Sequence, residues 1–310
     1  MPTPTPLPPL SPNGWLRWEV VSRLLPAPDR SLRVLEVGCG QGGFGARLAQ
    51  RYSYVGLEPD ATSSSVAVRR LAEAGGRGEV RHGDLSVLAE GDTFDLVCAF
   101  EVIEHIEDDH AAMTAWADRL VPGGSVLLST PAWAKRFGPA DEMVGHFRRY
   151  DPPVLRDLLT GAGLVDVELV HFGAPLGYLL EAGRNAVGRR RLAAAAATAG
   201  PTGSAGHSGP IGSSGSAGPS ADESMAARSE ASGRTMQPSS SFTATAARLG
   251  TVPFRAVQRA FPNTGPGLVA RARKPAASLP DDAVRCSAIG AGQVPRSTRA
   301  SDLPTHSGQV

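Results

Sequence analysis

A glycine-rich turn with a carboxylate beside it carries the most specific chemistry in the sequence. The segment RVLEVGCGQGGFG, residues 33–45, places Glu36 two residues before Gly38, and Gly40 and Gly42 follow. Glycine lets the backbone approach a bound molecule closely, and a helix after such a turn offers free amide groups at its N-terminus. The segment therefore predicts a turn that binds a cofactor.

Two classes of cofactor fit this turn. Gly38, Gly40 and Gly43 match the G-x-G-x-x-G fingerprint of dinucleotide binding, in which the helix N-terminus meets a pyrophosphate. An E-x-G-x-G-x-G pattern runs from Glu36 to Gly42 in the same residues. A carboxylate beside the turn repels a pyrophosphate but attracts the ammonium and sulfonium groups of S-adenosylmethionine. Glu36 therefore favours S-adenosylmethionine over NAD(P).

Further side chains with suitable chemistry follow the next predicted strands. Glu58 ends the run VGLE, where a carboxylate can accept hydrogen bonds from both ribose hydroxyls of either cofactor. Asp84 and Leu85 follow the third run, and Asp84 suits a hydrogen bond to the adenine amino group. Phe100 and Glu101 stand where the fourth strand reaches the cofactor crevice.

Two histidines are candidate catalytic residues. His105 lies in EVIEHI after the fourth predicted strand, and His146 lies in DEMVGHFRRYDP after the fifth. An imidazole can accept a proton near neutral pH, which matters where an acceptor must lose one. A structural role remains an alternative for each of them.

Two arginines stand shortly after His146. Arg148 and Arg149 could bind an anionic acceptor, because guanidinium pairs well with carboxylate or phosphate. The alternative is that Asp141 or Glu142 pairs with them and holds the loop in place.

The elements that must position these residues alternate between strand and helix from residue 32 to about residue 172. Such alternation predicts a parallel sheet with helices on both faces. An amphipathic helix is predicted within 13–26. The predicted strands are LRVLEV, YVGL, GEVRH, FDLVCAF, SVLLST and VDVELVHF, with helices near 43–51, 62–74, 107–120 and 153–161.

Composition divides the chain into ordered and disordered parts. Segments rich in Ala, Gly, Ser and Pro cannot bury enough apolar surface to offset the entropy of ordering. In the C-terminal part, Val252, Phe254, Val257 and Phe261 are expected to face the core from a short helix, and GLVARAR reads as a strand. The predicted organisation is a disordered N-terminus 1–12, a domain 13–193, a disordered insertion 194–241, the rest of the domain 242–274 and a disordered tail 275–310.

The segments VLEVGCGQGGFG, VGLEP, GDL, FDLVCAFEVIEHIED and LVPGGSVLLSTP together resemble the class I S-adenosylmethionine-dependent methyltransferases. The nearer likeness is to the small-molecule branch around the ubiquinone-biosynthesis O-methyltransferases. The resemblance implies an α/β fold with a doubly wound, mostly parallel, seven-stranded Rossmann-like sheet whose last strand, here GLVARAR, is antiparallel. It also implies a set of cofactor-binding residues, which are Glu36, Gly38, Gly40, Gly42, Glu58, Asp84 and Leu85, with Phe100 and Glu101 at the crevice.

The function expected from this resemblance is methyl transfer from S-adenosylmethionine to a small-molecule acceptor, at oxygen. Methyl transfer displaces a neutral thioether, so alignment carries much of the catalysis. The alternatives are an NAD(P)-dependent oxidoreductase and a non-catalytic protein that binds S-adenosylmethionine. No oligomeric state is predicted.

Composition and charge exclude other classes of function. The net charge of +1 and the lack of a basic patch argue against a nucleic-acid substrate. Three scattered cysteines favour a reducing compartment and form no metal site by their spacing. No run is long enough to span a membrane, and the N-terminus lacks a secretory signal, so a cytoplasmic location is expected.

Overall fold

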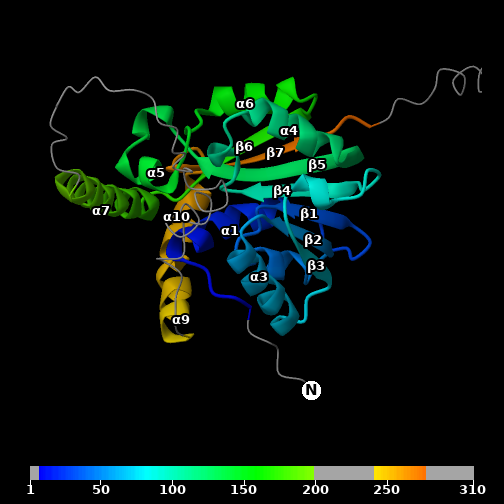
Figure 1. The fold of residues 1–310 in the computed structure, drawn as a ribbon, viewed down its shortest axis with the longest axis horizontal. Coiled ribbons are helices and arrows are strands. Elements are labelled where there is room, and N and C mark those ends of the chain that lie inside the picture. The colour runs from blue at the N-terminus through cyan, green and yellow to red at the C-terminus, as the bar shows by residue number, and fades with distance from the viewer. Residues whose placement is uncertain (1–6, 199–240, 277–310) are drawn as a thin grey trace, which may run out of the picture. The chain divides into compact units, whose positions relative to one another are not determined.

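The computed structural model describes residues 7–198 and 241–276. Within these residues seven strands form one sheet in the order β3-β2-β1-β4-β5-β7-β6 (Figure 1). The strands are β1 Arg33–Val37, β2 Ser53–Glu58, β3 Gly78–His82, β4 Phe94–Phe100, β5 Leu120–Pro131, β6 Val165–Phe172 and β7 Gly267–Arg273. Each contains or overlaps a run that the pattern of the sequence predicts as a strand, so these predictions are confirmed.

The sheet is parallel apart from its last strand. Strands β1 to β5 pair in parallel, whereas β7 runs antiparallel to both of its neighbours, β5 and β6. Strand β7 lies between β5 and β6, where Leu268, Val269 and Ala270 are fully buried. Burial of these apolar side chains stabilises β7 in this position. The predicted α/β fold with a final antiparallel strand is therefore confirmed.

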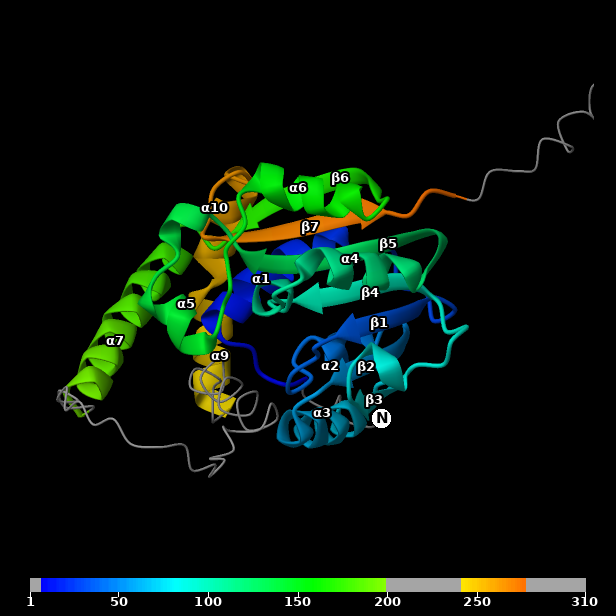
Figure 2. The same cartoon turned by 45° about the horizontal axis from the view of Figure 1, so that its top comes forward.

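Helices cover both faces of the sheet (Figures 1 and 2). The apolar cluster on one face draws on α4 and α6, with Trp116 and Leu158 among its members, and the cluster on the other face draws on α1, α2 and α3. The helices are α1 Pro12–Leu24, α2 Gly45–Leu48, α3 Ala61–Glu73, α4 Asp109–Asp118, α5 Pro139–Val144, α6 Pro152–Gly161, α7 Leu176–Thr198, α9 Ser241–Gly250 and α10 Val252–Ala260.

The helix predicted near 43–51 is shorter than expected. Helix α2 spans Gly45–Leu48 only, because the turn of positive-φ glycines continues up to Gly42. The helices predicted near 62–74, 107–120 and 153–161 correspond to α3, α4 and α6. No helix in the described ranges is long and apolar enough to cross a membrane.

The predicted disordered segments need two corrections. In the predicted N-terminal segment 1–12, Leu10 is buried and the hydroxyl of Ser11 accepts a hydrogen bond from the backbone of Gly14, so it caps α1. Helix α7 extends to Thr198, so residues 194–198 are helical where disorder was expected. The run of alanines there has high intrinsic helix propensity. Most of the predicted insertion and tail lies outside the described residues.

The predicted inward face of α10 is wrong. Val252, Val257 and Phe261 are between 40% and 59% exposed, and only Phe254 packs against the core. Gln258 is buried instead. Its side chain donates to the carbonyl of Leu16 and to Glu19 of α1, and accepts from the backbone of Gly173. The buried carboxylate of α1 therefore sets the rotation of α10, because buried polar groups need partners.

Candidate functional site

The glycine-rich turn lies at the carboxyl end of β1, where β1 adjoins β2 on one side and β4 on the other. The strand order changes direction here, and open α/β sheets bind ligands at such points. Gly38, Gly40 and Gly42 all have positive φ. A Cβ at Gly38 would lie 2.7 Å from Val102 Cγ2, and one at Gly42 would lie 3.1 Å from the backbone of Ala67. Conformation therefore favours glycine at all three positions, and space requires it at Gly38 and Gly42.

Glu36 lies beneath the turn rather than on its surface. Its side chain is almost fully buried, and Oε2 accepts a hydrogen bond of 2.6 Å from the Tyr54 hydroxyl of β2. A Cβ added at Gly45, the first residue of α2, would lie 3.0 Å from this same oxygen. The carboxyl group therefore sits between the first two strands and the start of α2.

Burial decides the charge of Glu36. It raises the pKa of this carboxyl to about 8, and the charge of Glu58 adds to the increase, while the hydrogen bond from Tyr54 opposes it. The group is therefore largely protonated at neutral pH before a ligand arrives. A cation placed beside it would favour the ionised form.

Glu58, at the end of β2, holds the turn from the other side. Its Oε2 accepts from the backbone N–H of Gly40 at 2.7 Å, and its Oε1 accepts from the N–H of Asp60 at 3.0 Å. Each carboxylate oxygen has a second lone pair for a further donor. Glu58 is thus both a brace for the turn and a group able to accept from a ligand.

The third and fourth strand ends complete the rim. Asp84 is exposed, and its Oδ1 accepts a hydrogen bond from the backbone N–H of Ser86. Hydrogen bonds from the side chain and then from the backbone of Ser86 lower the pKa of this carboxyl. Leu85 is half-buried beside it, at the start of a 3-10 turn, Leu85–Val87. Phe100 is buried at the end of β4 against Phe44, with ring centroids 4.9 Å apart.

Glu101, the residue after β4, has a strained backbone with φ of 58°. Left-handed conformations of non-glycine residues are uncommon and cluster at functional sites. The side chain is tied on both oxygens: Ser129 Oγ donates to Oε1 at 3.1 Å, and Arg17 of α1 pairs with Oε2 at 3.1 Å. Arg17 therefore links the N-terminal helix to the crevice, a contact that local pattern could not reveal.

The two predicted histidines meet in space. The ring centroids of His105 and His146 are 4.6 Å apart in an edge-to-face arrangement, although 41 residues separate them in the chain. The backbone N–H of Phe147 donates to the carbonyl of Glu104 at 2.8 Å, and this bond ties the α5 loop to the 3-10 turn Ile103–His105. The structure thus brings both candidate bases to one place.

His146 is oriented by a carboxylate. Its Nδ1 lies 2.8 Å from Asp141 Oδ1, so Nε2 is directed away from Asp141. The guanidinium of Arg149 also binds Asp141, through Nε and Nη2, and pairs with Glu181 of α7. Although burial raises the pKa of Asp141, the hydrogen bonds from His146 and Arg149 outweigh it and lower the pKa to about 2. Asp141 is therefore an ionised acceptor for the ring.

The predicted alternative, in which Asp141 or Glu142 pairs with the arginines after His146, holds for Arg149 but not for Arg148. Arg149 pairs with Asp141 as described, and Arg148 pairs with Asp109 of α4 at 2.8 Å. Both guanidinium groups are thus engaged within the protein.

Glu104, which sequence reasoning did not select, lies fully buried beside the histidines. Thr130 donates to its Oε2 at 3.2 Å, while Oε1 has no hydrogen-bond partner and lies 3.9 Å from His146 Nε2. Burial, and then the charge of Glu101, raise the pKa of this carboxyl well above its usual range. Three side chains here each offer one metal-ligand atom: Glu104, His105 and His146. These three atoms lie within 4.8 Å of one another, so they form a donor set able to hold a divalent cation. No metal site was predicted.

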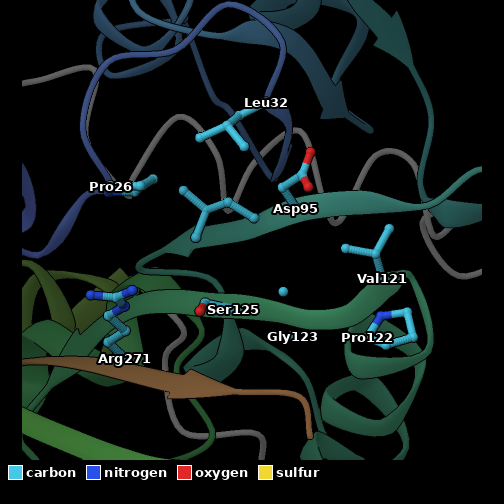
Figure 3. A pocket seen from close by; sticks show the side chains of 10 residues that line it. Pro26, Leu32, Asp95, Val121, Pro122, Gly123, Ser125 and Arg271 are labelled. Carbon is cyan, nitrogen blue, oxygen red and sulfur yellow. The ribbon is translucent and has the colours of Figure 1, made fainter. Parts of the chain in front are cut away.

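A separate hollow of about 290 Å³ opens at the amino ends of β4 and its neighbours, opposite the end that carries the glycine-rich turn (Figure 3). Asp95 near the beginning of β4 and Ser125 in the middle of β5 line it together with Arg271 of β7. The amino ends of the parallel strands lie here, far along each strand from the glycine-rich turn. This hollow is therefore distinct from the candidate site.

Comparison with known proteins places this geometry in a family. Residues 16–169 match a family model described as a methyltransferase domain. The ubiquinone biosynthesis O-methyltransferase of Dinoroseobacter shibae is 41% identical over 108 residues, which are 34% of this chain and 43% of the relative. The protein of the same name from Rhizobium etli is 36% identical over 107 residues, again 34% and 43% of the two chains.

A solved structure shares the fold. Phosphoethanolamine N-methyltransferase 2 of Haemonchus contortus, in complex with phosphomonomethylethanolamine and S-adenosylhomocysteine, has a TM-score of 0.51 and 17% identity. The match covers 86% of this chain and 54% of that one. The present chain spans 43% of the length of the two curated relatives that it matches. From the matched domain, its relatives and the sheet topology, we conclude that residues 16–169 belong to a methyltransferase domain of the class I S-adenosylmethionine-dependent type.

Proposed function

We propose that this protein transfers a methyl group from S-adenosylmethionine to an oxygen of a small-molecule acceptor. The observation that carries the proposal is the set of carboxylates around the positive-φ turn: Glu36 beneath it and Glu58 beside it. An ionised carboxylate beside the turn opposes a pyrophosphate, and Glu36, protonated without a ligand, gains a favourable charge interaction only beside a cation. This supports S-adenosylmethionine over NAD(P) at the same turn.

The side chains at the strand ends have separate roles in this proposal. Glu36 would face the ammonium-bearing end of the cofactor across Gly38, Gly40 and Gly42, with Glu101 next to it at the end of β4. Glu58 would accept from the ribose hydroxyls while it continues to hold the turn. Asp84 and Leu85 would flank the adenine, where Asp84 is exposed and could accept from a ligand amine in addition to Ser86.

When bound, the cofactor supplies an activated methyl group, and the leaving group is a neutral thioether. The chain must align the acceptor and, where the acceptor is a hydroxyl, take its proton. We propose His146 as this base, because Asp141 holds Nδ1 and leaves Nε2 directed elsewhere. In this proposal the acceptor oxygen forms the new C–O bond, the C–S bond breaks toward sulfur, and Nε2 takes the proton.

His105 has a different place in the proposal. Its ring packs edge-to-face on His146, so it limits where the acceptor can lie and supports the orientation of the base. The two relatives named as ubiquinone biosynthesis O-methyltransferases favour oxygen as the methylated atom. The match covers only 43% of each of these relatives, so the identity of the acceptor is not carried over.

Isothermal titration tests the proposal first at the level of the cofactor. We expect S-adenosylmethionine and S-adenosylhomocysteine to bind at one site, and NAD and NADP not to bind. Tight NAD binding without S-adenosylhomocysteine binding would instead support the oxidoreductase. Cofactor binding with no methyl transfer to any member of a panel of phenols, alcohols and carboxylic acids would support a non-catalytic binding protein.

A further inference from the structure

The indole of Trp15 in α1 is surrounded by guanidinium groups. The Cζ atoms of Arg47, Arg248 and Arg255 lie 5.1, 5.6 and 5.7 Å from its ring centroid. These arginines come from three elements, α2, α9 and α10, which the fold brings together at α1. We call these four residues the Trp15 stack. Stacking on an aromatic face is a favourable arrangement for arginine, but it leaves the edges of each guanidinium free for hydrogen bonds.

Within the described residues, no carboxylate pairs with any guanidinium of the stack. Arg47 donates to the carbonyl of Gly43, and Arg255 donates to the carbonyl of Arg248. Carbonyls accept hydrogen bonds but carry no charge to neutralise these cations. Two more donors, Trp15 Nε1 and Arg255 Nε, are buried with no hydrogen-bond partner. The stack therefore holds an excess of donors and of positive charge.

Neighbouring arginines on α1 and α10 are neutralised, unlike those of the stack. Arg17 of α1 pairs with Glu101, and Arg259 of α10 pairs with Glu19. Arg47 is 5% exposed, and its pKa is lowered to about 10 by burial and then by the charge of Arg248. Bringing these cations together thus costs free energy, and a bound anion would recover it.

We propose that the Trp15 stack binds an oxyanion of the phosphate class. Guanidinium groups bind phosphate through paired, charge-assisted hydrogen bonds, and three of them converge on one indole here. The contact of Arg47 with Gly43 places the stack beside the glycine-rich turn, on the side of α1. The proposed anion site uses residues other than Glu36 and Glu58, and it does not depend on the proposed methyl transfer.

The surface next to the stack indicates two sources for such a phosphate. Leu249, Val252 and Val257 of α9 and α10 are between 40% and 63% exposed close to Arg248 and Arg255 in the chain. An apolar surface beside cations suits the headgroup region of an anionic lipid. A soluble phosphate ester has the same anionic group and needs no apolar surface. The chemistry of recognition is shared, and the experiment separates the sources.

Tryptophan fluorescence and isothermal titration of the full chain test the proposal. Inorganic phosphate and glycerol 3-phosphate are added in one arm, and vesicles of phosphatidylcholine with or without phosphatidylglycerol in the other. We expect saturable binding in at least one arm, with a dissociation constant of about 1 mM or tighter for a soluble anion. We also expect a fluorescence change that is lost in Trp15→Phe.

Variants assign the binding to the stack. Arg248→Gln and Arg255→Gln should each weaken binding about tenfold, since each removes a charge-assisted contact. Arg69→Gln, which removes an exposed arginine of α3 that pairs with Glu73, is the matched control and should bind as the wild type does. Binding of S-adenosylhomocysteine should persist in all of these variants, so failure of the anion site is distinguishable from failure of the methyl-donor site.

The outcomes are decisive in each direction. Binding of soluble phosphate that the stack variants weaken supports the site with a soluble ester as ligand. Binding only to vesicles that contain phosphatidylglycerol, again weakened by the variants, supports it with a lipid headgroup as ligand. The proposal is overturned if neither arm shows binding, or if Arg248→Gln and Arg255→Gln bind as tightly as Arg69→Gln.

Discussion

The hydroxyl of Tyr54 on β2 donates a hydrogen bond of 2.6 Å to the carboxyl group of Glu36 on β1. The pair lies beneath the glycine-rich turn, and both side chains are at most 2% exposed. A Cβ at Gly45 or at Gly56 would collide with the Tyr54 ring, so small residues make room for this contact. The charge state of Glu36 is therefore set by the fold and is open to change by a cationic ligand.

Cofactor binding should release a proton. Glu36 has a pKa of about 8 without ligand and is mostly protonated at pH 7, whereas an adjacent cation favours the ionised carboxylate. Affinity for S-adenosylmethionine should accordingly rise with pH up to about 8 and level off above it. Isothermal titration at pH 7 in buffers of different ionisation enthalpy measures the released protons. Glu36→Gln should bind more weakly and release none, and a wild-type protein that releases none would contradict the role of Glu36.

Removing Asp141 should cost stability at neutral pH. The Asp141→Asn variant leaves Arg149 buried with one carboxylate fewer, and breaking such a buried pair costs about 3 kcal/mol. The folded-state pKa of Asp141 is lowered to about 2, so its contribution is present above the unfolded value of 3.8 and is lost as pH falls through about 2. Urea unfolding at pH 7 and pH 3 measures both effects. Asp118→Asn, an exposed change on α4, serves as control and should shift neither value.

The His146→Gln variant should lose turnover and keep the cofactor. Loss of a general base lowers kcat by about 100-fold or more, while the carboxylates around the turn are untouched. Single-turnover methyl transfer and the dissociation constant for S-adenosylhomocysteine separate the two effects. His110→Gln, an exposed histidine of α4, is expected to behave as the wild type. Unchanged turnover in His146→Gln would remove this residue from the chemistry.

Alanine at two glycines of the turn should have unequal costs. Gly38→Ala adds a Cβ 2.7 Å from Val102 Cγ2 at φ of +67°, whereas Gly40→Ala at φ of +54° meets no atom within 4 Å. Both changes carry the cost of a left-handed residue, about 1 kcal/mol or more, and only the first adds a clash. Thermal unfolding of both variants without ligand compares them. An equal loss of stability would show that Val102 moves aside at little cost.

Local pattern was sufficient for the strands and for most helices. Periodicity, apolar runs and glycine positions are properties of short segments, and they identified the seven strands of the described residues, whereas the antiparallel direction of β7 was implied by the family resemblance. The same reasoning was wrong about α10, where the apolar residues face outward. Glu19 on α1, more than 230 residues away in the chain, needs the amide of Gln258 as partner, and no local periodicity contains that requirement.

The candidate site also has a part that the sequence predicts and a part that it does not. The sequence alone determined which residue types stand at the strand ends, because a glycine turn and the carboxylates near it are local in the chain, and these indicated the class of cofactor. Only the tertiary structure decided that His105 meets His146, that Glu104 lies unpartnered on one oxygen beside them, and that three arginines share one indole. Such contacts join segments far apart in the chain. The free energy of burying and pairing charges depends on the distances between these groups, and only the folded chain fixes those distances.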